Sequence, residues 1–554
     1  MELLIDLFGY LSIVVHGLTI LAQSMALGGV LFLVALARPL APRLGAAGAR
    51  IADRCARIAG WSALALLASE AATVALQTAV LVGTIGMDVG DALGANFAVA
   101  GLLKTGVAAI LAMLLLVRGR FAPTLPLLCA VAIALSAAIL TTHAVARVDG
   151  RGPLLAAAWL HQLGAAIWIG GIPCFLLALA NLHDGASWRL VGERFSRMSM
   201  LGVVCILISG ITMSVLYIGD VEGFYGTAYG VMVGAKIAMF LMLLALGGMN
   251  FILVERLRAN PATPITRMRR FAEVELGIGA AIFFAAASLT SVPPAIDLTK
   301  DRVSWAEIVE RNTPVWPRLA SPDHDSLALP ALQAKLDAEA ALQKSAPQVA
   351  FIPGAGELPP RNADDIAWSE YNHHWAGLFV AAVGILALMN RAGVGWARHW
   401  PLVFLGLAAF LFVRSDPETW PLGDIGFFES FRDVEVAQHR GYVVLILVFA
   451  WFEWRVRARG WANRGAAYVF PLLCAGGGVL LLTHSHAIAN IKDQLLIELT
   501  HTPLALAGII AGWARWLELR LDPKANATAR AVSGWVWPAA ILFCGILLLI
   551  YREA

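Results

Sequence analysis

The segment Leu481–His501, LLTHSHAIANIKDQLLIELTH, gathers metal-binding side chains between two long apolar runs. Glu498 and His501 are three residues apart, which places them on one face of a helix, where both can reach a single metal ion. His484 and His486 are two residues apart and would point in nearly opposite directions on a regular helix. We therefore expect one of these two histidines to be a ligand and the other to be a neighbouring or gating residue, unless the helix end is unwound.

Three more histidines lie where other apolar runs begin. Imidazoles combined with carboxylates, without a thiolate, suit copper(II), zinc, iron or nickel. A single histidine near a membrane interface is most often only an amphipathic ring at the headgroup level. Several histidines placed within separate membrane spans are energetically costly, and such polar residues are usually functional. The predicted metal site consists of His373, His374, His439, His484, His486, Glu498 and His501.

A second set of polar residues interrupts the apolar runs of the amino-terminal part. Three histidines in this set form a candidate second metal station: His16, His143 and His161. The same part contains four charged residues that we expect to be buried: Glu70, Lys104, Lys236 and Glu275. An ionisable residue inside a membrane is a functional hypothesis by default, with an opposite charge as its partner. The alternative is a buried Lys–Glu pair that only fixes helix packing.

The helices that must position these residues follow from the composition. The chain has 554 residues, of which 59% are hydrophobic and 14% are charged, so it reads as an integral membrane protein. Apolar runs long enough to cross a bilayer recur from end to end, and we count about fourteen of them. We predict an all-α fold, a polytopic transmembrane helical bundle. The net charge of +3 is small, which makes nucleic acid an unexpected partner.

The arginine-rich loops indicate the orientation, because such loops face the cytoplasm. They alternate with acidic loops in a way that puts the amino terminus outside. A polar, proline-rich segment then also lies outside and divides the chain in two. The predicted domains are an amino-terminal bundle of about eight helices at 1–293, an extracytoplasmic loop region at 294–371, and a carboxy-terminal bundle of about six helices at 372–554.

Four successive stretches carry a family resemblance: AAWLHQLGAAIWIGGIPCF, FSRMSMLGVVCILISGITMSV, YGVMVGAKIAMFLMLLALGGMNF and EVELGIGAAIFFAAASLTSVPP. They resemble the helices of the copper resistance D (CopD) family of bacterial inner-membrane proteins. The carboxy-terminal bundle resembles the extension of longer CopD-like proteins. The conspicuous positions of the family correspond here to His161, Gly170, Gly171, Lys236 and Glu275.

The resemblance implies a multi-pass protein of the bacterial inner membrane, with its amino terminus and large loop in the periplasm. It also implies a role in copper resistance or copper movement, often alongside a small periplasmic copper-binding protein of the CopC type. No CopC-like domain is visible in this sequence, so such a partner would be a separate chain. The expected ligand is a copper ion, and the expected surroundings are the lipid bilayer.

The leading functional hypothesis is a copper-binding protein that takes up or transports copper from the periplasmic face. Several partial sites suit transport better than one closed cage. The absence of a GxxxxGK[ST] loop excludes a self-contained ATPase pump. The first alternative is a haem b electron carrier or oxidoreductase, ligated by a pair such as His439 and His501. The second alternative is a metalloenzyme that faces the periplasm; we favour a transporter or metal-binding protein over an enzyme.

Overall fold

The computed structural model describes residues 4, 7–299, 302–322, 363–460, 465–483 and 491–552. These residues are almost entirely helical, and they contain no strand beyond an isolated bridge between Thr419 and Ile425. The predicted all-α fold is therefore confirmed. Nine segments of the described chain are long and apolar enough to cross a membrane, whereas the figure of about fourteen spans stays a prediction.

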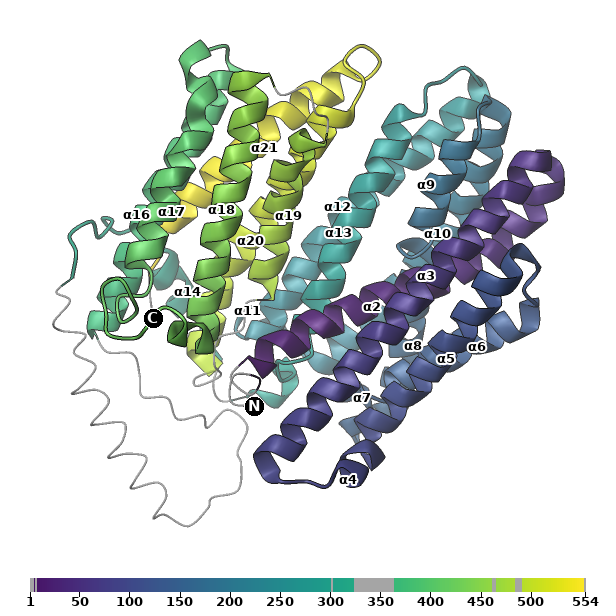
Figure 1. Cartoon of the computed structure of the whole chain (residues 1–554), viewed down its shortest axis with the longest axis horizontal. Coiled ribbons are helices and arrows are strands. Elements are labelled where there is room, and N and C mark those ends of the chain that lie inside the picture. Colours follow the sequence, from purple (N-terminus) through teal and green to yellow (C-terminus); the bar gives the residue numbers. More distant parts are fainter. Residues whose placement is uncertain are drawn as a thin grey trace. The chain divides into compact units, whose positions relative to one another are not determined.

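The chain forms two compact units, each treated by itself below. Unit 1 consists of Met1–Val221, Val233–Asp297 and Arg520–Ala527. Unit 2 consists of Glu222–Met232, Leu298–Leu519 and Thr528–Ala554. Figure 1 shows long helices running through each unit, with short connections at their ends.

Unit 1 is built from long helices joined by short turns. Its helices are α2 (Phe8–Phe32), α3 (Arg38–Ile85), α4 (Val89–Gly94), α5 (Asn96–Arg118), α6 (Thr124–Ile139), α7 (His143–Ala146), α8 (Arg151–Trp168), α9 (Ile172–Asn181), α10 (Gly185–Tyr217), most of α12 (Ala228–Ala259) and α13 (Thr266–Leu289). Asp184 begins α10 as its cap, because its carboxylate accepts the backbone N–H of Ser187 at 2.8 Å.

A π-helical turn, Leu33–Ala37, joins α2 to α3. The backbone leaves helical geometry at Gly45, where φ is +56°, and the rest of α3 packs against α2. Helices α2 and α8 also approach each other closely. A Cβ on Gly28 would lie 2.1 Å from the carbonyl oxygen of Ala166, and one on Gly170 would lie 1.9 Å from that of Ser24. Only glycine fits at these two positions.

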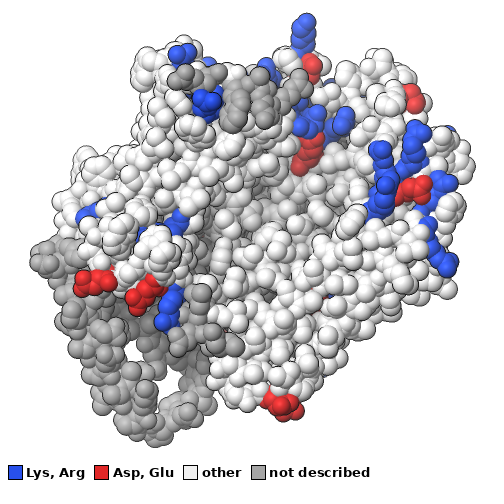
Figure 2. Space-filling view, viewed as in Figure 1, with Lys and Arg blue, Asp and Glu red and all other residues white. Residues whose placement is uncertain are grey.

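The outer surface of the helices is apolar. The apolar window of α10 is only 17% buried, and side chains such as Val204, Ile208 and Ile211 are exposed. On the face drawn in Figure 2, broad areas of surface carry no charge, and most of the visible charged side chains lie near helix ends. Exposed apolar helix faces with satisfied backbones are what a lipid environment requires.

Unit 2 contains the carboxy-terminal helices. They are α11 (Val221–Tyr225), α14 (Trp305–Asn312), α16 (Ala363–Arg391), a 3₁₀ segment (Gly395–Leu402), α17 (Val403–Arg414), α18 (Val434–Arg459), α19 (Val469–Leu482), α20 (Ile491–Arg520) and α21 (Ala527–Leu549). Its core is aromatic: the ring of Trp400 lies 5.5 Å from the rings of both Phe470 and Trp537, and Phe404 meets Phe449 edge to face at 4.6 Å.

A buried network of charges, which we call the Arg–Glu network, ties α16, α18, α20 and α21 together. Glu453 is 1% exposed and accepts hydrogen bonds from Arg457 at 2.6 Å and from Arg515 at 3.0 Å. Arg515 also pairs with Glu518 at 2.7 Å, and Glu518 accepts the indole N–H of Trp537 at 2.8 Å. Arg391 completes the network at 3.2 Å from Glu518. Each carboxylate thus pairs with two guanidinium groups.

Candidate metal centre

Two of the predicted ligands in unit 2 come together around an aromatic ring. His373 lies on α16, His501 lies on α20, and their ring centroids are 6.1 Å apart. Tyr551, which is 2% exposed, stacks on His373 at 3.9 Å and meets His501 edge-on at 6.4 Å. We call these three residues the ring cluster. It joins residues that are far apart in the sequence in one partly buried place.

The hydrogen bonds of His373 fix its tautomer. Its Nδ1 donates to the carbonyl oxygen of Ser369 at 2.9 Å, and a carbonyl can only accept. The ring proton therefore sits on Nδ1, and the lone pair of the neutral imidazole is on Nε2. A neutral imidazole whose N–H is held by a carbonyl is the usual arrangement of a metal-ligating histidine.

His374 has a different environment from its neighbour. It is 1% exposed, and its Nδ1 accepts the backbone N–H of Arg318 at 2.7 Å. Its Nε2 donates to the carbonyl oxygen of Tyr551 at 2.8 Å. Both ring nitrogens are engaged with the backbone, so in this conformation His374 connects chain segments instead of presenting a lone pair to a metal.

Glu498 precedes His501 by one helical turn on α20, and both residues are half-buried. The carboxylate of Glu498 accepts the hydroxyl of Thr502 at 3.0 Å. The other two predicted ligands, His484 and His486, lie outside the described residues. In the part of the chain that is described, no three residues among histidine, cysteine, aspartate and glutamate form a group that could hold a metal ion. The metal site thus stays a prediction.

His439, at the start of α18, is paired with Asp416, which follows α17. Its Nδ1 lies 2.7 Å from Asp416 Oδ1, and the hydroxyl of Ser415 donates to Asp416 Oδ2 at 2.7 Å. Burial disfavours the charged form of this carboxylate, but the hydrogen bond and charge of His439 outweigh it and lower the pKa of Asp416. A histidine that binds a metal through one ring nitrogen often donates its other ring N–H to a carboxylate.

This pair predicts an acid-dependent stability. Because the pKa of Asp416 is lower in the folded than in the unfolded protein, its contribution is complete above the unfolded value of about 3.9 and is lost as pH falls through the folded value. We expect Asp416→Asn to lower the free energy of unfolding at neutral pH by about 1.5–3 kcal/mol and to flatten its decline in acid. Thermal unfolding in detergent across pH measures both effects, with the exposed Asp149→Asn as the control. An equally steep acid decline in Asp416→Asn would contradict the assignment.

In unit 1, two of the predicted buried charges form an ion pair. Lys104 Nζ on α5 lies 2.6 Å from Glu70 Oε1 on α3, and the two residues are 5% and 3% exposed. The ammonium group of Lys104 also interacts electrostatically with His16 of α2. Lys104 and Glu70 therefore neutralise each other's charge inside the bundle, as expected for ionisable residues among apolar helices.

Removing one partner of this pair should cost more than removing both. Glu70→Gln leaves the ammonium of Lys104 buried without its counter-charge, and we expect about 3–5 kcal/mol of destabilisation. The double variant Glu70→Gln, Lys104→Met should recover most of that loss. Unfolding by a denaturing detergent measures the free energies, with Asp53→Asn of the exposed Asp53–Arg120 pair as control. If the double variant were no more stable than Glu70→Gln, the destabilisation could not come from the unpaired charge of Lys104.

The remaining polar residues of unit 1 each have a separate partner. His161 Nδ1 lies 3.0 Å from the hydroxyl of Ser209, and Lys236 acts on His161 through its charge. Glu275, which is 4% exposed, accepts the side-chain amide of Asn250 at 2.6 Å. The structure thus gives the three histidines of the candidate second station different partners, and that station also stays a prediction.

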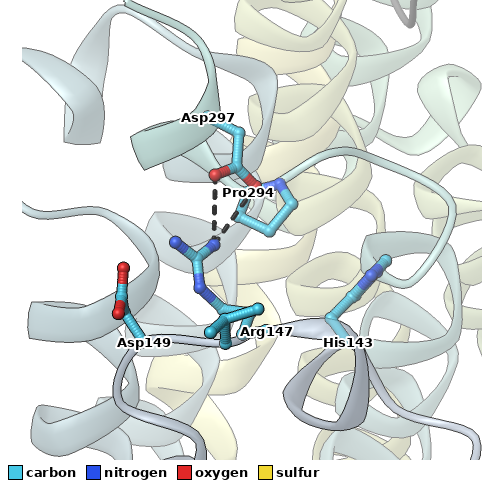
Figure 3. Close-up of a pocket in the computed structure, with 6 residues that line it drawn as sticks. His143, Arg147, Asp149, Pro294 and Asp297 are labelled. Carbon is cyan, nitrogen blue, oxygen red and sulfur yellow. Dashed lines mark hydrogen bonds and ion pairs between the residues drawn. The ribbon is translucent and has the colours of Figure 1, made fainter.

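His143 borders a pocket of about 300 Å³ at the end of unit 1. Its Nε2 donates to the carbonyl oxygen of Thr290 at 3.0 Å. Arg147 pairs with Asp297 at 3.1 Å, and Figure 3 shows the His143 ring and the Arg147 guanidinium on either side of Pro294. The Arg147–Asp297 ion pair thus lines one side of the pocket, and the imidazole of His143 lines the other.

Comparison with known proteins gives two matches. The family described as Copper resistance protein D matches residues 189–289, which contain Lys236 and Glu275 but not His161, Gly170 or Gly171. A Bacillus subtilis (strain 168) protein named "Copper transport protein CutJ" is 32% identical over 139 residues, which make up 24% of this chain and 24% of that protein. The match thus spans about a quarter of that relative. No solved structure matches.

Proposed function

We propose that this chain, whose residues 189–289 match the copper resistance protein D family, takes up copper from the periplasmic face of the bacterial inner membrane. Its family and its apolar helices make it a copper-related membrane protein. The direction of movement, the orientation in the membrane and the residues that hold the ion are parts of the proposal.

The observation that carries the proposal is the ring cluster. His373 and His501 come from different helices, lie 6.1 Å apart between ring centroids, and have Glu498 one turn away. The tautomer of His373 keeps the lone pair on Nε2, the atom that a copper ion would use. Two imidazoles and one carboxylate are ligand types that suit copper, and in our proposal they contribute to a partial site, which would load and release an ion more readily than a closed cage does.

The other predicted ligands extend this site. In our proposal His484 and His486, which lie outside the described residues, are further copper ligands, and His439 with Asp416 forms another position on the copper route. His374 holds the chain beside the cluster through its two backbone hydrogen bonds. A separate periplasmic protein of the CopC type would deliver the ion.

Reconstitution into liposomes tests uptake. The purified full-length chain is placed in vesicles that contain a copper-sensitive dye, and copper is added outside. We expect copper to accumulate above the level of protein-free vesicles, and His501→Ala to return it to that level. Zinc added at the same concentration serves as the control for selectivity. Vesicles in which the wild-type chain takes up no more copper than protein-free vesicles would overturn the transport proposal.

A further inference from the structure

Two cysteines that the sequence keeps far apart are neighbours inside unit 1. Cys55 lies on α3 and Cys174 lies on α9, two helices that pack against each other. Both cysteines are 0% exposed, their thiols are close enough to interact, and neither is in a disulfide. Two thiols in direct contact form a potential ligand pair, unlike a single buried cysteine.

Cys174 lies at the start of a helix within the apolar region. Cys174 is the third residue of α9, whose first turn also contains Pro173. The preceding break at Gly170 and Gly171 creates this helix end within the apolar region. Broken helices inside membrane bundles typically mark ion sites.

A second cysteine pair shows what a purely structural arrangement looks like. Cys474 on α19 and Cys544 on α21 both lie in unit 2 and interact electrostatically. Their thiols donate to backbone carbonyls of α20, from Cys474 to Gly508 at 3.5 Å and from Cys544 to Leu504 at 3.8 Å. A thiolate at either position would face a carbonyl oxygen, so this pair is poorly suited to a metal.

The Cys55–Cys174 pair lies near one end of unit 1. Arg54, next to Cys55, donates to Asn181 Oδ1 at 2.7 Å, and Asn181 is the last residue of α9. The pair is therefore about 10 Å from that helix end, at the usual helical rise. On the predicted topology this end faces the cytoplasm.

We propose that Cys55 and Cys174 bind copper(I) as the inner station of the copper route, an inference that rests on the proposed function. Soft sulfur ligands select copper(I), whereas the imidazoles of the ring cluster also accept copper(II). In the binding step the ion forms bonds to both sulfurs, one S–H bond breaks, and its proton leaves to solvent. One positive charge replaces another, so the buried site gains no net charge and no oxidant or reductant is needed.

X-ray absorption at the copper edge tests the site. The full-length protein in detergent is loaded with copper(I) without oxygen, and the atoms around copper are identified from the spectrum. We expect two sulfur neighbours in the wild-type protein. The variant Cys55→Ser, Cys174→Ser should lose these sulfur neighbours and one equivalent of copper(I), whereas the matched control Cys474→Ser, Cys544→Ser should keep both.

Several outcomes decide against the inference. Sulfur-bound copper(I) that persists in the Cys55→Ser, Cys174→Ser variant would overturn it, and so would a wild-type spectrum without sulfur neighbours. The wild-type spectrum decides even if the serine variant fails to fold, and Cys55→Ala, Cys174→Ala provides a second form without thiols. Wild-type copper uptake into liposomes without sulfur ligation would reject the cysteine station alone. Sulfur ligation without uptake would reject the transport proposal alone.

Discussion

The variant His373→Ala, His501→Ala is expected to retain less copper through purification than the wild-type protein, by the equivalent held at the ring cluster, while it keeps its fold. Both imidazoles border Tyr551, and His373 presents Nε2 as the atom with a lone pair. Without these two rings, Glu498 is the only described member of the proposed site around the ring cluster that can still bind copper, and one carboxylate holds copper(II) weakly. Elemental analysis of the purified variant measures the loss, and circular dichroism checks the helices.

Two matched variants separate metal binding from structure. His399 accepts the indole N–H of Trp454 at 3.1 Å and has no part in the proposed site, so His399→Ala should retain copper at the wild-type level. His374→Ala leaves the N–H of Arg318 and the carbonyl of Tyr551 without their partner and should lower stability more than it lowers copper retention. A copper content in His373→Ala, His501→Ala equal to that of the wild-type protein would refute the role of the ring cluster.

Glu453→Ala is expected to be the most destabilising single substitution in unit 2. Glu453 is 1% exposed and compensates both Arg457 and Arg515, so its removal leaves two guanidinium groups short of negative charge inside the bundle. Breaking a buried pair in this way costs about 3–5 kcal/mol. Unfolding in a denaturing detergent should show the loss as an earlier transition of unit 2.

The control for this substitution is Glu255→Ala. Glu255 lies 3.9 Å from Arg258, both side chains are largely exposed, and such surface pairs contribute little to stability. Glu255→Ala should therefore unfold close to the wild-type protein. If Glu453→Ala unfolded at the same denaturant concentration as Glu255→Ala, the Arg–Glu network would not stabilise the bundle as described.

The all-α fold could be predicted from the sequence because long apolar runs in a chain with few charges have one stable form in a bilayer. The pairing of Glu70 with Lys104 could also be expected, since an intramembrane charge needs an opposite charge. The end of the bundle shared by His373 and His501 followed from the lengths of the runs between them. These inferences depend only on polarity and length.

Other features depend on side-chain packing, which no sequence pattern records. Tyr551 carries no motif, yet its ring stacks on His373 and meets His501 edge-on. Cys55 and Cys174 lack the spacing of a metal motif, and only the packing of α3 against α9 makes them neighbours. Their spatial proximity arises from tertiary packing, which leaves no periodic signal along the chain.

The arginines near the end of α18 show a different limit. The stretch RVRARGWANR was interpreted only as a positive loop that sets the orientation. In the structure Arg457 lies within α18, pairs with Glu453 and packs over the ring of Trp400 at 5.1 Å. A count of positive charges per loop cannot distinguish an arginine in solvent from one that pairs inside the bundle.

The most direct test of copper binding is elemental analysis of the detergent-purified protein after growth in copper, with the visible spectrum recorded on the same sample. We predict stoichiometric copper and no haem band. Iron together with a strong Soret band would contradict the copper assignment and would support the haem b alternative.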